Sequence, residues 1–173
     1  TAVKTPVSNI FPYIKKNLDD IITVEDDELI VAFLDMVENH KKIVENSGLL
    51  TVAARKHLGV KDKRVGSILS GGNMDVITMS SVVQQGLIFR DRIFTVSVLL
   101  PDKPGELAKV SQTLADVQGN VIKLEHNQLV TTNRSAAVEL RITLECFGTE
   151  HKEQIIAALE KKGYKPRIVR TMI

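Results

Sequence analysis

Hydrophobic and polar residues between Arg92 and Arg170 follow two different periods, and segments of one period alternate with segments of the other along the chain. Apolar residues at every second position mark a strand, whereas apolar residues three or four positions apart mark a helix. The order of the periods is strand, helix, strand, strand, helix, strand. We expect strands at residues 93–100, 136–147 and 164–169 and a strand that begins with residues 121–124, with the helices after the first and third strands.

This order predicts a ferredoxin-like βαββαβ domain. The first strand is apolar on one face and carries Thr95 and Ser97 on the other, so we expect one face of the sheet to be covered and the other to be wetter. Gly119 and Gly163 are expected to end the two helices.

The first half of the chain has a different pattern, in which short β-branched runs precede amphipathic helices. The runs are residues 20–24, 42–45 and 64–69. Strands that alternate with helices predict a parallel sheet with right-handed crossovers. Because three parallel strands would leave both sheet edges open, we expect an incomplete parallel three-layer α/β piece. The pattern changes near residues 84–91, so we place one domain at 1–90 and the second at 91–173.

Composition and charge restrict the classes of partner. The chain has 43% hydrophobic residues and a formal net charge of +2, which is typical of a globular protein and gives no reason to expect nucleic acid. Ferredoxin-like RNA readers stack bases on aromatic side chains, and aromatic residues make up only 4% of this chain. No apolar run approaches the ~20 residues of a membrane span. The one cysteine, Cys146, fits a reducing compartment, so we expect a cytoplasmic protein. The histidines are not spaced as metal ligands, and no metal site is expected.

The turn after the first strand of the second half carries a specific motif, Leu100-Pro101-Asp102-Lys103-Pro104-Gly105-Glu106-Leu107. Glycine there lets the backbone come close to a ligand or a neighbouring strand, and the amides that begin a helix can hold a carboxylate or a phosphate. The motif alone is also compatible with a tight turn that binds nothing. With this motif, residues 92–170 resemble an ACT domain, a regulatory module that senses amino acids in metabolic enzymes.

The resemblance implies that two such modules pair, and that an effector binds where the first turn of one module meets the second strand of its partner. It therefore implies a small amino-acid effector and a homo-oligomer formed through ACT pairing, without indicating which amino acid binds. The effector-binding residues that it assigns are Asp102, Gly105, Glu106 and Leu107 from the turn, with Asn120, Val121 and Ile122 from the strand.

The first half resembles a second family through residues 1–6, 42–48 and 68–75. These segments are similar to the last third of the catalytic domain of threonine ammonia-lyases, which are enzymes of fold-type II that use pyridoxal 5'-phosphate (PLP). The resemblance assigns Ser70 to a hydroxyl that faces the pyridine nitrogen of PLP. It assigns Gly71 and Gly72 to backbone that passes close to the ring, and Glu45 to a carboxylate nearby. A hydroxyl leaves the pyridine nitrogen less protonated than a carboxylate would. The alternatives are that Ser70 caps the following helix and that Glu45 faces solvent.

Two motifs of that family do not occur in this sequence: the Ser-x-Lys that carries the Schiff-base lysine, and the run of glycines that grips the phosphate. Without that lysine the chain cannot hold PLP in the usual covalent form, so we expect no catalytic residue here and no PLP bound to this chain alone.

The leading hypothesis is the C-terminal part of a threonine ammonia-lyase, an enzyme that converts threonine to 2-oxobutanoate and ammonia and serves isoleucine biosynthesis. It would need the remainder of the catalytic domain as its partner, and its ACT domain would regulate it allosterically. The alternative hypothesis is a free-standing amino-acid-binding regulator without catalysis.

Overall fold

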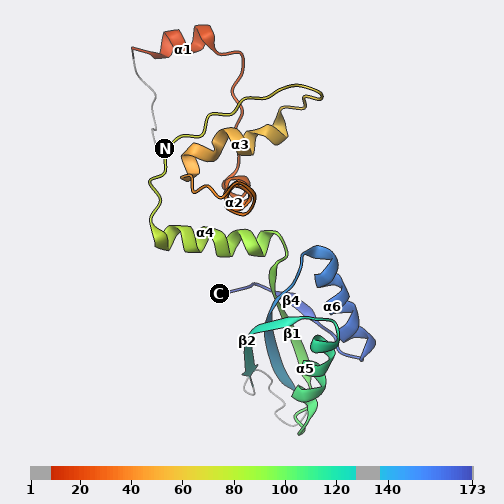
Figure 1. Ribbon diagram of the computed structural model, residues 1–173. Helices are drawn as coiled ribbons and strands as arrows, with labels where there is room; N and C mark the ends of the chain where they lie inside the picture. The colour runs from red at the N-terminus through yellow and green to blue at the C-terminus, as the bar shows by residue number, and fades with distance from the viewer. Residues whose placement is uncertain (1–8, 128–136, 173) are drawn as a thin grey trace. The chain divides into compact units, whose positions relative to one another are not determined.

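The computed structural model describes residues 9–127 and 137–172 of the chain. Contacts divide the described residues into two compact units, and the division falls between Val83 and Gln84 (Figure 1). Two features used in the sequence predictions, residues 1–6 and the expected start of the third strand at 136, lie outside the described residues.

The second unit has the predicted βαββαβ order. Its elements are β1 (Ile93–Leu100), α5 (Glu106–Asp116), β2 (Asn120–Asn127), β3 (Val138–Glu145), α6 (Thr149–Lys161) and β4 (Arg167–Val169). The strands form one sheet in the order β2-β3-β1-β4, in which every neighbouring pair is antiparallel. The ferredoxin-like architecture is confirmed, and α5 and α6 cover the same face of the sheet (Figure 1).

The core of the second unit lies between this sheet face and the two helices. Its buried residues are Phe94, Val96, Val98, Leu100, Val110, Leu114, Leu140, Ile142, Leu144, Cys146, Ile155 and Leu159. The alternation of apolar residues along β1 and β3 supplies most of the sheet side of this core, because successive side chains point to opposite faces. Cys146 acts as a small core residue, and its burial raises the pKa of the thiol.

The centre of the opposite face of the sheet is less exposed to solvent than the sequence predicts. Thr95 and Ser97 are buried, because they pair with polar side chains of β3. The hydroxyl oxygens of Thr95 and Thr143 lie 3.0 Å apart, and Ser97 Oγ donates to Glu139 Oε1 at 2.6 Å. The Thr95 and Ser97 hydroxyl groups therefore have hydrogen-bond partners within the sheet.

Both helices of the second unit end in a Schellman motif, in which two amides bond back to carbonyls of the last turn. After α6 the left-handed residue of the motif is Gly163, with φ +88°, as predicted. After α5 it is Gln118, with φ +58°, rather than the predicted Gly119. A Cβ on Gly119 would lie 3.3 Å from Ile155 Cδ1, so packing against α6 explains that glycine.

Helices dominate the first unit. They are α1 (Phe11–Asn17), α2 (Asp26–Asp35), the π-helix η1 (Met36–His40), the 3-10 helices η2 (Asn46–Leu49) and η3 (Arg55–His57), α3 (Leu50–Ala54) and the first part of α4 (Val76–Phe89), which continues into the second unit. A capping box between Glu25 and Glu28 begins α2. The core of this unit contains Leu29, Ile30, Ala32, Phe33, Met36, Val44, Leu49, Ala53 and Val82.

The predicted parallel strands of the first half are wrong. Residues 20–24, 42–45 and 64–69 form no strand, and the described part of this half contains no sheet. A β-branched run becomes a strand only where a neighbouring strand completes its backbone hydrogen bonds, and these runs form isolated hydrogen bonds instead. Examples are Glu45 N–H to the Gly71 carbonyl at 3.3 Å and Thr51 Oγ1 to the Ile68 carbonyl at 3.0 Å.

Candidate functional site

The turn between β1 and α5 owes its shape to Gly105. This residue has φ +89° and stands at the N-cap of α5, where most side chains would be strained. No protein atom lies within 4 Å of the position that a Cβ would take, so no neighbouring strand requires a glycine here. The left-handed backbone therefore explains the glycine, and the space beside it is open.

A hollow of about 320 Å³ lies against this turn. It is lined by Leu100, Pro101, Asp102, Lys103, Pro104, Gly105, Glu106, Leu107 and His126. The four turn residues predicted to contact an effector thus line one hollow. The hollow combines carboxylates, an ammonium group and an imidazole with apolar leucine and proline surfaces, which is a suitable lining for a small zwitterion with an apolar side chain.

The Glu106 carboxylate is positioned by its own helix. Lys109 Nζ donates to Glu106 Oε1 at 2.6 Å, and this contact raises the pKa of the Lys109 ammonium group. An ion pair of this kind on one helix face holds the carboxylate at the rim of the hollow.

His126 was not predicted as a site residue. The sequence pattern predicts that residues 121–124 begin the second strand, and β2 continues from there to Asn127 and carries His126 to the hollow. A histidine at the end of an alternating run gives a weak sequence signal, because its contact with the turn depends on the tertiary fold.

The three predicted strand residues lie at the other end of β2. Asn120 is six positions from His126, or ~20 Å at the rise of a strand. The Asn120 side-chain amide donates to Glu145 Oε2 at 3.1 Å, and the Val121 and Ile122 side chains are exposed. One copy of the chain therefore does not bring Asn120, Val121 and Ile122 to the hollow. Since β2 is an edge strand, its outer hydrogen-bonding groups face away from the sheet.

A second candidate site lies in the first unit, where Glu45 meets the turn 70–73. Glu45 Oε1 accepts a hydrogen bond from Ser47 Oγ at 2.7 Å, and Glu45 Oε2 accepts one from the Asn73 amide at 3.3 Å. A Cβ on Gly71 would lie 2.3 Å from Glu45 Oε1, and φ of Gly71 is +79°. The Glu45 carboxylate thus points into the turn, so the alternative in which it simply faces solvent is wrong.

Packing on the other side of the same turn depends on Gly48. A Cβ there would lie 1.7 Å from the carbonyl oxygen of Ser70, so only glycine lets the two segments approach this closely. The four predicted cofactor residues, Glu45, Ser70, Gly71 and Gly72, are therefore neighbours in the structure.

Ser70 does not cap a helix. The cap of α4 is Asp75, whose Oδ1 accepts the amides of Ile77 at 2.9 Å and Thr78 at 3.0 Å. The hydrogen bonds from Thr78 hold the pKa of the Asp75 carboxyl below its usual range. The helix-cap alternative for Ser70 is therefore wrong, and the residue lies on an exposed face.

This exposed face fits one side of a flat heteroaromatic ring. Ser70, Gly71 and Gly72 are all exposed, and no atom lies within 4 Å of the position that a Cβ on Gly72 would take. Bare glycine backbone beside a hydroxyl allows close approach of a ring whose nitrogen meets the hydroxyl.

Among the described residues, no group of three or more histidine, cysteine, aspartate or glutamate side chains could hold a metal ion. The helices that the structure describes include none whose length and apolar character would allow it to cross a membrane.

Comparisons with known proteins agree with both resemblances. Residues 94–163 match the ACT domain family. The chain is 34% identical over 165 residues to an L-threonine ammonia-lyase of Geobacter sulfurreducens, a match that covers 94% of this chain and 41% of the relative. It is 32% identical over 169 residues to an L-threonine ammonia-lyase of Thermotoga maritima, covering 97% of this chain and 42% of the relative. It is also 28% identical over 167 residues to the biosynthetic L-threonine dehydratase of Escherichia coli, covering 94% of this chain and 32% of the relative.

Residues 94–163 are therefore an ACT domain. The chain as a whole is related to the L-threonine ammonia-lyases along 94% of its length or more, and it spans about two fifths of the length of the two relatives that are most similar among these three. Both resemblances predicted from the sequence are confirmed.

Proposed function

We propose that this chain is the regulatory C-terminal part of a PLP-dependent threonine ammonia-lyase, and that its ACT domain binds an amino-acid effector at the β1–α5 turn. The observation that carries the proposal is the hollow beside Gly105, which is lined by four of the seven effector residues that the family resemblance assigns. The enzyme's reaction would be conversion of threonine to 2-oxobutanoate and ammonia. The relatives' names support this reaction and a biosynthetic role, for which we propose isoleucine biosynthesis in the cytoplasm.

The lining of the hollow suggests how an amino acid would bind. The carboxylates of Asp102 and Glu106 are suited to an α-ammonium group, and Lys103 and His126 are suited to a carboxylate. An apolar side chain would contact Leu107 and its proline neighbours. A zwitterion satisfies both sets of charges, which a purely anionic or cationic ligand would not.

The second part of the effector site would come from another copy of the chain. Asn120, Val121 and Ile122 lie on the exposed edge strand β2, and edge strands pair readily with one another. Pairing of two ACT domains along this edge would bring the exposed strand residues of one copy toward the turn of the other. Effector binding would then favour one paired arrangement and shift the enzyme between states.

In the enzyme, PLP would supply the electron sink for the reaction. The groups of this chain that would contact it are the Ser70 hydroxyl, which would meet the pyridine nitrogen, and the backbone of Gly71 and Gly72. Glu45 would act indirectly, because its carboxylate is hydrogen-bonded to Asn73 and fixes the turn. The remainder of the catalytic domain would provide the lysine, so this chain alone is proposed to be inactive.

One observation favours the alternative of a free-standing regulator. The second unit has a complete sheet and its own buried core, and such a unit can bind an effector without a catalytic domain. Both functions share the amino-acid site, and they differ in whether threonine is consumed when the remainder of the catalytic domain is supplied.

Titration calorimetry of the purified chain with isoleucine, valine, serine and threonine tests the proposal. We expect saturable binding of at least one of the four, weakened at least tenfold by Glu106→Gln. Glu150→Gln is the matched control, because Glu150 occupies the corresponding first turn of α6 and lies away from the hollow. Absence of binding to all four amino acids, or equal weakening by both variants, would contradict the proposed site.

A further inference from the structure

Asp91 occupies a backbone position that favours glycine. At the end of α4, the amide of Arg92 bonds to the Leu87 carbonyl at 2.8 Å, and the amide of Asp91 bonds to the Ile88 carbonyl at 3.0 Å. These two bonds form a Schellman motif, and Asp91 is its left-handed residue with φ +52°. A glycine would adopt this backbone without strain, so the aspartate side chain needs its own explanation.

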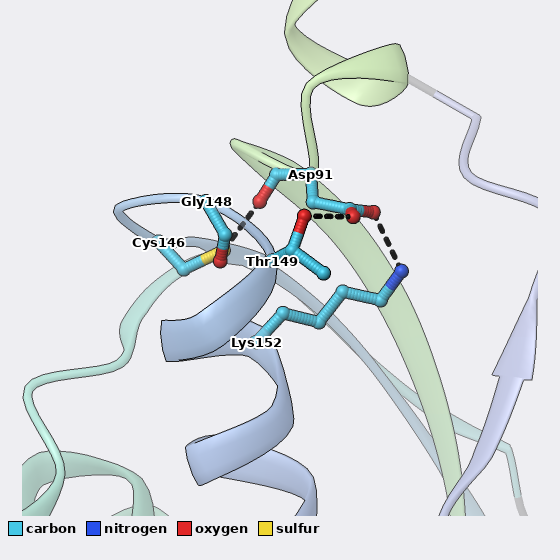
Figure 2. A network of polar contacts seen from close by, with 5 residues as sticks. All are labelled: Asp91, Cys146, Gly148, Thr149 and Lys152. Carbon is cyan, nitrogen blue, oxygen red and sulfur yellow. Dashed lines mark hydrogen bonds and ion pairs between the residues drawn. The ribbon is translucent and has the colours of Figure 1, made fainter.

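That side chain fastens the turn to the start of α6. Asp91 Oδ1 accepts from Lys152 Nζ at 2.6 Å, and Asp91 Oδ2 accepts from Thr149 Oγ1 at 2.8 Å. The Asp91 carbonyl accepts from Cys146 Sγ at 2.7 Å. Figure 2 shows the Asp91 carboxylate between Thr149 and Lys152, with Cys146 beside its main chain.

Both partners of the ion pair are largely shielded from solvent. The Lys152 side chain is 21% exposed and the Asp91 side chain 25% exposed. The Lys152 ammonium also lies 5.7 Å from the centroid of the Phe94 ring, a core residue of β1. A shielded and doubly hydrogen-bonded carboxylate is stabilised more than a surface ion pair, which typically contributes little.

The contacts of Asp91 lie between the passage from one unit to the other and the candidate effector site. The chain passes from the first unit to the second within α4, since the division falls between Val83 and Gln84. β1 begins two residues after Asp91 and ends at Leu100, which lines the hollow at the β1–α5 turn. One central strand therefore connects the Asp91 turn directly to the candidate effector site.

We propose that Asp91, Thr149 and Lys152 form a latch, which fixes the end of α4 on the ACT domain. When an effector binds to that domain, the latch transmits the conformational change to α4. Its regulatory role rests on the function proposed above. A shift of β1 relative to α6 on effector binding would alter the geometry of the latch, and the end of α4 would respond. Asp91 is thus a positioning residue, which neither touches the effector nor takes part in catalysis.

Hydrogen exchange of the whole chain tests the latch. Asp91→Gly relieves the left-handed backbone but removes the carboxylate, and Asp91→Asn keeps a residue that tolerates this backbone but removes the charge. We expect both variants to exchange the amides of residues 90–92 at least tenfold faster than the wild type. Gln118→Gly is the control, because it makes the same backbone change after α5, and its neighbouring amides should exchange no faster. An Asp91→Gly variant that exchanges at the wild-type rate or more slowly would overturn the latch.

The regulatory role is tested by repeating the exchange with the tightest binder among isoleucine, valine, serine and threonine. In the wild type we expect this amino acid to change the exchange of residues 84–90 at least threefold. In Asp91→Asn the affinity should stay within twofold of the wild type, while the change in exchange is lost. A change that persists in Asp91→Asn overturns the transmission through Asp91. If none of the four binds the wild type, the proposed function fails and the transmission with it, whereas the latch itself is still decided by the exchange without ligand.

Discussion

The backbone N–H of Phe147 donates a hydrogen bond of 3.1 Å to Nδ1 of His151, and the Phe147 ring stacks on the imidazole with 4.9 Å between the ring centroids. Because Nδ1 accepts, Nε2 carries the ring hydrogen and donates to the Val117 carbonyl at 2.7 Å. His151 is only 9% exposed. His151 therefore joins the start of α6 to the residue that follows α5.

Replacement of His151 by leucine is expected to lower the free energy of unfolding by ~1–3 kcal/mol, because two part-buried hydrogen bonds are lost and each contributes ~0.5–1.5 kcal/mol. His151→Asn should cost less, since its side-chain oxygen can still accept from the Phe147 amide. Urea denaturation measures both. A leucine variant within ~0.5 kcal/mol of the wild type would show that this imidazole is dispensable.

The helix ends offer a stabilising change. Gln118→Gly is expected to raise the free energy of unfolding by ~1 kcal/mol, because a left-handed backbone costs a residue with a Cβ ~1–2 kcal/mol. Gly163→Ala makes the opposite change at the equivalent position after α6 and should destabilise by a similar amount. Thermal unfolding of the two variants compares them directly, and shifts of the same sign would refute the assignment of both motifs.

In the turn beside Glu45, stability is expected to depend more on the glycine at position 71 than on the one at position 72. Gly71→Ala introduces a Cβ 2.3 Å from Glu45 Oε1 at φ +79°, so it should destabilise the first unit by more than ~1 kcal/mol. Gly72→Ala points into open space and should cost less. Scanning calorimetry of both variants checks the difference, and equal costs would show that Glu45 does not pack on the turn as described.

The Asp91 contacts make stability depend on pH in a defined direction. The hydrogen bond from Lys152 lowers the pKa of the Asp91 carboxyl, and the hydrogen bond from Thr149 acts in the same direction. A carboxyl whose folded-state pKa is depressed contributes stability that is fully present above its unfolded value of ~4 and is lost as the pH falls through the folded value. The stability difference between wild type and Asp91→Asn should therefore be constant from pH 7 to ~5 and shrink below pH 4. Urea denaturation across this range measures it, and a difference that grows in acid would contradict the assignment.

Local patterns were sufficient to predict the second unit, because its strands and helices pack against one another within the same 80 or so residues. The alternation along β1 and β3 gave both the order of the elements and the core positions. The strands predicted for the first half were wrong, since a run such as residues 20–24 has the side chains that a strand requires but does not show whether a neighbouring strand exists to pair with it.

Particular site residues were missed for the same reason. His126 lines the hollow together with residues 100–107, which are far from it in the sequence, and a histidine carries no period that reveals such a contact. The turn residues of the candidate effector site could be predicted because Pro104 and Gly105 leave a local signature. Gly119 was predicted to end α5, whereas Gln118 takes the left-handed position and Gly119 is required by packing against Ile155.

The central claim is that an amino acid binds in the hollow at the β1–α5 turn, and that a second copy of the chain completes the site. Amide chemical shifts of the isotopically labelled chain, followed by nuclear magnetic resonance during titration with the tightest-binding amino acid, test this claim most directly. We predict that the largest shifts cluster at Gly105, Leu107 and His126 and, separately, at residues 120–122 at the far end of β2. Shifts that leave both groups unchanged while other residues respond would contradict the claim.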